Sequence, residues 1–153
     1  MSTPTLEPTV NSAWKLDVQA ATPATFTPVR AINSLNPTVN YTTQDASDFD
    51  SEGWGSDAIT QRKWQVTATV LRKIASGTTE DPGQARLRAA ADAVELVTVR
   101  FYDSSFPGGE AFEGDCYVQW APAGGPGTGL QSVNITLLGQ GERRKIANPT
   151  AEG

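Results

Sequence analysis

Carboxylates are the side chains in this sequence best able to bind an ion or move a proton, and they gather in one segment. Between positions 45 and 57 the chain carries no Lys or Arg but holds Asp45, Asp48, Asp50, Glu52 and Asp57. Acids and bases balance elsewhere, so this segment alone accounts for the net charge of −5. We expect a solvated or partner-facing acidic loop that does not bind nucleic acid, because contacts to phosphate groups need basic side chains.

The stretch from Asp48 to Gly53 is similar to the opening of a calcium-binding EF-hand loop, with oxygen ligands at alternate positions before a glycine. Such a loop also needs a glutamate six residues after the glycine, and Ile59 stands at that position. No helical pattern precedes the segment either. We therefore predict no metal site and no cofactor.

Catalytic side chains are scarce. Histidine is absent, which removes the commonest general base and the commonest metal ligand. Cys116 is the single cysteine, and its apolar, strand-like surroundings predict a small buried side chain rather than a nucleophile. Glu113 and Asp115 would act as paired catalytic carboxylates only in a cleft, and their strand-like pattern predicts solvent-facing charges instead. We expect no enzyme.

Arg143, Arg144 and Lys145 form a basic triple. Three charges are too few for a nucleic-acid site, so our hypothesis is that they pair with the acidic segment of a neighbouring subunit. Trp54 lies isolated among the acids, where it could stack on a sugar or fill a pocket on another subunit. With the five acids, these four residues are the candidate interface residues.

Alternation of apolar and polar residues predicts several half-buried strands. They cover residues 14–20, 59–74, 96–102, 112–120 and 131–138, with a weaker candidate over 29–39 that Pro37 interrupts. Asp81 followed by Pro82 predicts the start of one amphipathic helix over about 82–95. The 14 Gly and 10 Pro residues cluster between these segments.

These elements predict a mainly β fold: an antiparallel sandwich or barrel of six to eight strands with one flanking α-helix. At 153 residues the chain fits a single domain over 1–153, with a mobile N-terminal arm at 1–10. No apolar run is long enough to span a membrane. The start lacks a signal-peptide pattern, so we expect a protein made and kept in a cytoplasm unless something else exports it.

The order of four segments resembles a known family. An acidic stretch ends in Trp54–Asp57, a long strand covers Thr60–Lys73, and Cys116–Trp120 precedes a glycine-rich connection and Val133–Gly141. This order resembles the major tail tube proteins of siphophages, particularly those infecting actinobacteria, over roughly residues 14–147.

That resemblance implies a tail-tube fold and a structural role in the virion tail. Subunits of the family form hexameric rings that stack into a tube, and DNA passes through the tube on ejection without specific binding. The implied partners are further copies of the chain and the tape measure, tail terminator and baseplate proteins, with no membrane. The resemblance also implies that an acidic loop at about 40–58, the N-terminal arm and a C-terminal arm at 143–153 bridge subunits and rings.

Two alternatives remain open from the sequence. A β-sandwich binding module of carbohydrate-binding or adhesin type would use Trp54 to stack on a sugar. Within the structural class, another tail component, a head–tail joining protein or a tube protein of a contractile system would carry the same strand pattern. Rings or tubes formed by the pure protein favour the tail tube, whereas glycan binding by a stable monomer favours the module.

Overall fold

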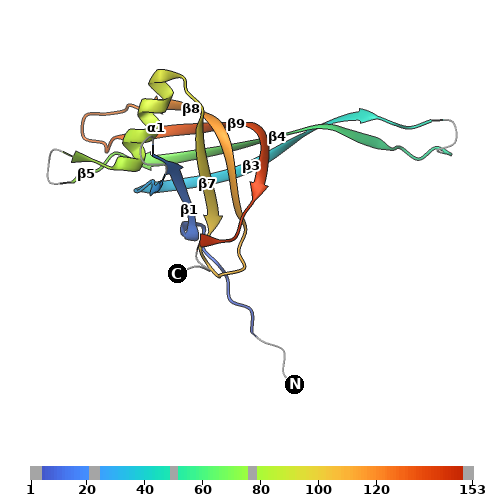
Figure 1. Cartoon of the computed structure of the whole chain (residues 1–153), viewed down its shortest axis with the longest axis horizontal. Coiled ribbons are helices and arrows are strands. Elements are labelled where there is room, and N and C mark those ends of the chain that lie inside the picture. The colour runs from blue at the N-terminus through green and yellow to red at the C-terminus, as the bar shows by residue number, and fades with distance from the viewer. Residues whose placement is uncertain (1–4, 21–24, 49–51, 76–78, 150–153) are drawn as a thin grey trace.

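The computed structural model describes residues 5–20, 25–48, 52–75 and 79–149. Within them the chain is mainly β, with one α-helix and a single-turn 3-10 helix (Figure 1). In chain order the elements are η1 (Asn11–Ala13), β1 (Trp14–Gln19), β2 (Phe26–Pro28), β3 (Ile32–Asp45), β4 (Asp57–Leu71), β5 (Ile74–Ala75), β6 (Thr79–Glu80), α1 (Pro82–Ala93), β7 (Val97–Asp103), β8 (Ala111–Pro122) and β9 (Ser132–Lys145).

Seven strands of the described chain form one antiparallel sheet in the order β2-β1-β7-β8-β9-β4-β3. The sheet curls strongly, since the rings of Trp64 on β4 and Phe101 on β7 approach to 5.8 Å between centroids although β9 and β8 lie between these strands. Alternate residues therefore face a common interior, as the period-two pattern predicts. The predicted fold class, an antiparallel sandwich or barrel with one flanking helix, is confirmed.

The core is built from one face of each central strand. On β4 the buried residues Trp64, Val66, Ala68 and Val70 alternate with half-buried polar residues. The helix closes this interior, because Leu87 and Ala90 are fully buried in the same cluster. The helix therefore packs on the apolar face of the sheet, and α1 does not cover the opposite face of β4 and β9.

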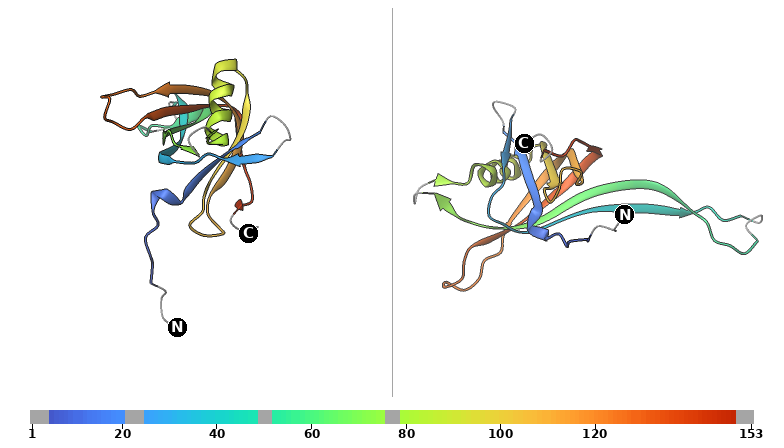
Figure 2. Two further views of the ribbon diagram at one scale, coloured as in Figure 1. Left: turned by 90° about the vertical axis from the view of Figure 1, so that its left-hand side faces the viewer. Right: turned by 90° about the horizontal axis from the view of Figure 1, so that it is seen from below.

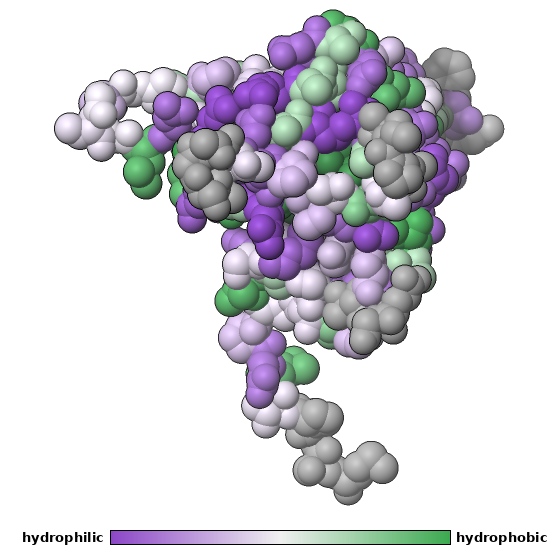
Figure 3. Space-filling model, turned by 60° about the vertical axis from the view of Figure 1, so that its left-hand side comes forward, coloured by the Kyte–Doolittle hydropathy of each residue, from purple (hydrophilic) through white to green (hydrophobic). Residues whose placement is uncertain are grey.

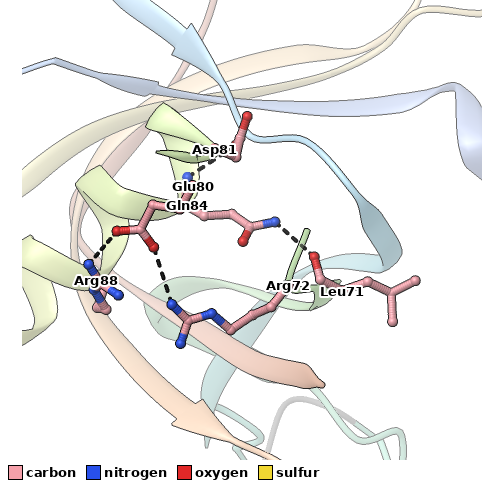
Figure 4. A network of polar contacts seen from close by, with 6 residues as sticks. All are labelled: Leu71, Arg72, Glu80, Asp81, Gln84 and Arg88. Carbon is pink, nitrogen blue, oxygen red and sulfur yellow. Dashed lines mark hydrogen bonds and ion pairs between the residues drawn. The ribbon is translucent and has the colours of Figure 1, made fainter. Parts of the chain in front are cut away.

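Polar contacts fix the helix to the sheet (Figure 4). Asp81 caps the helix by accepting a hydrogen bond from the backbone N–H of Gln84 at 3.2 Å. The buried amide of Gln84 donates to the carbonyl oxygens of Arg30 and Leu71, at 2.9 Å and 3.1 Å. Glu80 pairs with both Arg72 and Arg88. These contacts join the start of α1 to the end of β4 and the start of β3.

Strand β3 is an edge strand and is longer than the sequence predicts. Pro37 lies within it, opposite Val66, and an edge is where a strand tolerates a proline that cannot donate to a neighbour. The predicted acidic loop at 40–58 is wrong in its bounds, because β3 continues to Asp45 and β4 begins at Asp57. Both faces of these outer segments are exposed, so apolar alternation did not mark the outer part of β3 or the first two residues of β4, which the sequence predicts only from position 59.

The predicted C-terminal arm at 143–153 is also wrong at its start, because β9 continues through Lys145. The backbone N–H of Ile146 then donates to the carbonyl of Ala111. The buried amide of Asn148 donates to the carbonyls of Asp103 and Gly109, at 2.8 Å and 3.0 Å. Pairing with β8 extends this strand, and the periodicity of the sequence cannot predict such a long-range contact. Residues 5–10 carry no strand or helix and are exposed.

No described helix has the length and apolar character needed to cross a bilayer. The face shown in Figure 3 is mostly polar, with hydrophobic side chains scattered among polar ones.

Candidate functional site

The most unusual feature of the molecule is a two-stranded ribbon that projects beyond the sheet (Figure 1 and Figure 2, right). β4 pairs with β9 only over Gln65–Leu71, whereas β3 and β4 remain paired out to Asp45 and Asp57. We call residues 40–48 and 52–63 the projecting hairpin. An isolated hairpin is marginally stable in water, so this one gains stability from any surface that covers it.

Local contacts keep the hairpin paired to its outer end. The hydroxyl of Thr60 donates to the carbonyl of Thr42. Beyond the strands, the backbone N–H of Ala46 donates to the carbonyl of Ser56, and the N–H of Ser56 donates to the hydroxyl of Ser47 at 2.7 Å. The hairpin thus presents residues 45–48 and 52–57, which we call its acidic end, at a defined position.

The structure brings the predicted acids together at this end. Asp45 is the last residue of β3 and lies directly opposite Asp57, the first residue of β4. Asp48 and Glu52 are exposed nearby, and Asp50 lies outside the described residues. Like charges placed directly opposite destabilise a ribbon, so the pair favours a cationic partner. The N–H of Ser47 hydrogen-bonds to the Asp45 carboxylate and lowers the pKa of that group.

Trp54 lies in the same end and is 81% exposed. Tryptophan is one of the residues that contribute most to binding where an interface buries it. The sequence singled out Trp54 as an aromatic residue isolated among acids, and the structure adds that it is exposed at the outer end of a projecting ribbon.

The residues of the predicted basic triple lie on both faces of β9. Arg144 reaches the carboxylate of Glu113 on the neighbouring strand at 3.4 Å. Arg143 instead stacks its guanidinium 3.8 Å from the ring centroid of Phe112. Lys145 lies opposite Phe112 in the strand register. Because successive strand residues point to opposite faces, β9 separates Arg143 from Arg144.

Arg143 lines a groove of about 820 Å³ at the base of the hairpin. One wall is the hairpin, with the exposed apolar residues Tyr41 and Ile59 and the guanidinium-bearing Arg62; the other carries Phe112 and Arg143. Of the described residues that line it, three are basic and one, Glu142, is acidic. The sequence did not predict this groove, because its walls come from strands that are far apart in the sequence.

Trp64 forms the floor of the groove. Its indole is 4% exposed and lies against Gly139, where an added Cβ would stand 2.4 Å from two ring atoms, and against Gly114, where the distance would be 2.6 Å. Two glycines on β8 and β9 thus create the space for one tryptophan. The indole N–H has no hydrogen-bond partner among the described residues.

A second surface, the side of β3, β4, β9 and β8 opposite the core, is polar and uncharged along its two central rows, whereas the neighbouring rows carry Leu138 and Tyr117 beside Gln65 and Lys63 beside Asn40. Cross-strand rows place Asn36 beside Thr67, Thr136 and then Gln119, and the next row places Ser34 beside Thr69 and Asn134. Hydroxyl groups tie the rows together, as where Thr69 donates to the side-chain oxygen of Asn134 at 3.2 Å. We call these rows, with Thr38 and Gln65, the polar face.

The remaining candidates for chemistry are occupied or buried. Asp115 accepts a hydrogen bond from the hydroxyl of Thr98 at 2.6 Å, and Glu113 is held by Arg144. Burial, and secondarily the charge of Asp115, raises the pKa of the Cys116 thiol to about 12. Among the described residues no three Cys, Asp or Glu side chains are grouped as metal ligands.

The fold is that of solved tail tube structures. The chain is similar to a protein in the tail of an empty gene transfer agent particle with C6 symmetry, with a TM-score of 0.71 and 16% identity over 92% of this chain and 100% of that chain. It is similar to the SPP1 tail tube at a TM-score of 0.67 and 15% identity, covering 94% of this chain and 82% of that one.

A third similar structure comes from the baseplate of the anti-feeding prophage, with a TM-score of 0.57 and 10% identity over 96% of this chain and 98% of that chain. At these identities the likeness establishes the fold. No protein-family model matches the sequence, and no curated protein matches it significantly.

Proposed function

We propose that this chain is a tail tube subunit, a structural protein that assembles with copies of itself into stacked hexameric rings. The projecting hairpin carries this proposal. It extends beyond its own sheet, opposes two aspartates at Asp45 and Asp57, and exposes the large side chains of Tyr41, Trp54 and Ile59. Such a ribbon is costly in an isolated molecule and becomes favourable when neighbouring copies cover it.

The likeness to tail structures supports the same function. The similar structures come from a tail with C6 symmetry, a tail tube, and a baseplate with six-fold symmetry. A chain of this fold that presents a long edge strand, β3, fits assembly through strand edges, since a closed ring removes the edge from solvent. In the virion the subunit would also meet tape measure, terminator and baseplate proteins.

We propose further that the polar face lines the channel through which DNA passes. Its two central rows of Thr, Asn, Gln and Ser carry no Lys or Arg, and Lys63 lies further out beside Asn40, so the central rows offer no cations to hold phosphate groups. Their hydroxyl and amide groups keep the wall hydrated. A hydrated, uncharged wall lets a polyanion slide without a strong attractive or repulsive field.

Electron microscopy of the purified protein tests the assembly. Concentrated protein is expected to form rings with six-fold symmetry and tubes of uniform width. A variant in which a short Asn-Gly turn replaces residues 42–60 should remain folded but form neither. Compact single molecules of the unmodified protein at every concentration and ionic strength would refute the proposal.

A carbohydrate-binding module is the second candidate, because Trp54 is 81% exposed. Substitution of Trp54 by Ala separates the two functions. A tail tube subunit loses assembly, whereas a binding module stays monomeric and loses glycan affinity in a glycan-array measurement.

A further inference from the structure

The groove at the base of the hairpin has the composition of a binding site for an acidic, aromatic segment. Among the described residues neither Arg62 nor Arg143 forms an ion pair with a carboxylate, and the guanidinium of Arg143 stacks on the ring of Phe112. Tyr41 and Ile59, which lie with Arg62 on the hairpin wall of the groove, are 57% and 61% exposed. Arginine and aromatic residues in a concave site are the groups that contribute most to protein interfaces.

The pairing of the hairpin strands places these side chains on one face. Arg62 lies opposite Tyr41, and Ile59 lies opposite Thr43, which is two residues from Tyr41. Directly paired residues, and residues two apart on a strand, point to the same side. The register shift between Thr42 and Thr43 therefore brings Ile59 to the side of the hairpin that carries Arg62.

The acidic end of the hairpin complements this site. It carries Asp45 and Asp57 directly opposite each other, with Trp54 exposed beside them. Two facing carboxylates match the two guanidinium groups of Arg62 and Arg143. Trp54 matches the aromatic and apolar walls, and an indole can also stack on an arginine.

The two complementary surfaces cannot meet within one molecule. Five strand positions separate Asp57 from Arg62 on the same strand, and an extended strand of that length spans about 17 Å. The paired ribbon holds this separation, so the acidic end stays away from its own groove. The partner that carries a matching acidic end is a second copy of the chain.

We infer that the groove receives the acidic end of the projecting hairpin from a neighbouring copy, with Asp45 and Asp57 on Arg62 and Arg143. This inference rests on the proposed function, and it assigns the contact to Arg62 and Arg143 rather than to the sequential triple at 143–145. The contact joins two different surfaces, so each copy offers one free groove and one free hairpin end. Repetition of such a contact gives closed rings or continuing stacks.

Charge reversal tests the inference. A hairpin variant carries D45K and D57K, a groove variant carries R62E and R143E, and K73E is the control because Lys73 is exposed, basic and absent from the groove. Each reversal is expected to raise the protein concentration needed for assembly by about tenfold or more, since like charges then meet at the contact. The control should assemble as the unmodified protein does.

Mixing provides the decisive measurement. An equimolar mixture of the two reversed variants should assemble, because every reversed end then meets a complementary groove, and a chain carrying all four changes should assemble alone. Circular dichroism of the separate variants confirms that both are folded. Assembly of either reversed variant alone at the concentration of the unmodified protein, or failure of the mixture, overturns the inference while the proposed function stands. If the unmodified protein never assembles, the proposed function fails instead.

A photocrosslinking amino acid at position 41 identifies the occupant. In tubes it should link to residues 45–57 of another copy and to nothing in free subunits, as read by mass spectrometry. A link to residues 5–10 or to any other segment would overturn the assignment of the hairpin end.

Discussion

Gly139 provides the space in which the Trp64 indole forms the floor of the groove, and its replacement by alanine tests that account of the core. The added Cβ would lie 2.4 Å from two carbons of the indole ring, whereas ordinary contact begins near 3.4 Å. The ring would have to retreat by about 1 Å against a close-packed interior. Trp64 is 4% exposed and its ring packs against Phe101, so neighbouring side chains leave the ring little room to move.

The size of the effect follows from two opposing contributions. Overpacking a well-filled core costs roughly 1–3 kcal/mol, and a rigid ring blocked by its neighbour lies at the upper end. Replacing glycine by alanine restricts the unfolded chain and returns about 0.4–1 kcal/mol. We therefore expect Gly139→Ala to lower the free energy of unfolding by about 2 kcal/mol. For a domain of this size, the melting temperature would fall by roughly 4–8 °C.

Urea unfolding followed by far-ultraviolet circular dichroism, below the concentration of assembly, measures the loss. Gly127→Ala is the matched control, because nothing lies within 4 Å of its added Cβ, and it should stay within about 0.5 kcal/mol of the unmodified protein. In a Trp64→Leu background the cost of Gly139→Ala should shrink by about 1–3 kcal/mol, because the obstructing ring is gone. An equal cost in both backgrounds would refute the steric explanation.

Three further predictions follow from other parts of the molecule. Val94 ends the helix with a φ of 52° and is 75% exposed, so Val94→Gly should raise the free energy of unfolding by about 0.5–1 kcal/mol in urea titrations; a lower value would contradict this. Cys116 should resist thiol reagents at pH 8 until urea unfolds the chain. Burial raises the pKa of this thiol from 9.0 to about 12, so its contribution to the free energy of unfolding is full below pH 9 and falls as the pH rises towards 12. Cys116→Ala should lessen that fall. Burial also raises the pKa of Tyr102, which accounts for part of the fall that remains. Thr67→Lys with Thr136→Lys should leave tubes intact yet make them retain duplex DNA in co-sedimentation, an effect that salt removes; unchanged retention would argue against the polar face as the channel wall.

The sequence was sufficient to predict the strands in which apolar and polar side chains alternate. The alternation of Trp64, Val66 and Ala68 with polar residues predicts a half-buried strand, because every second side chain must enter the core. Asp81 followed by Pro82 predicts the start of a helix, and in the structure the Asp81 carboxylate caps that helix. Such signals are local, since one strand or one helix turn determines them.

The projecting hairpin was not visible in this way. From Asn40 to Asp45 and from Asp57 to Lys63 both strand faces are exposed, so neither face had to be apolar; the sequence predicted the β4 side from position 59 but ended the β3 candidate at position 39. The sequence showed an acidic segment and an exposed-aromatic candidate, Trp54, and placed them in a loop that began at position 40, whereas the structure continues β3 to Asp45. The pairing of Asp45 with Asp57 became evident only from the register between two strands.

By itself the sequence determined the mainly β class, the single helix and the concentration of negative charge between positions 45 and 57, because composition and short periods encode these. Only the tertiary structure decided that Arg143 faces the groove with Arg62 while Arg144 pairs with Glu113. Strand pairing made that division, since neighbours in sequence point to opposite faces and residues far apart in sequence become neighbours across the sheet.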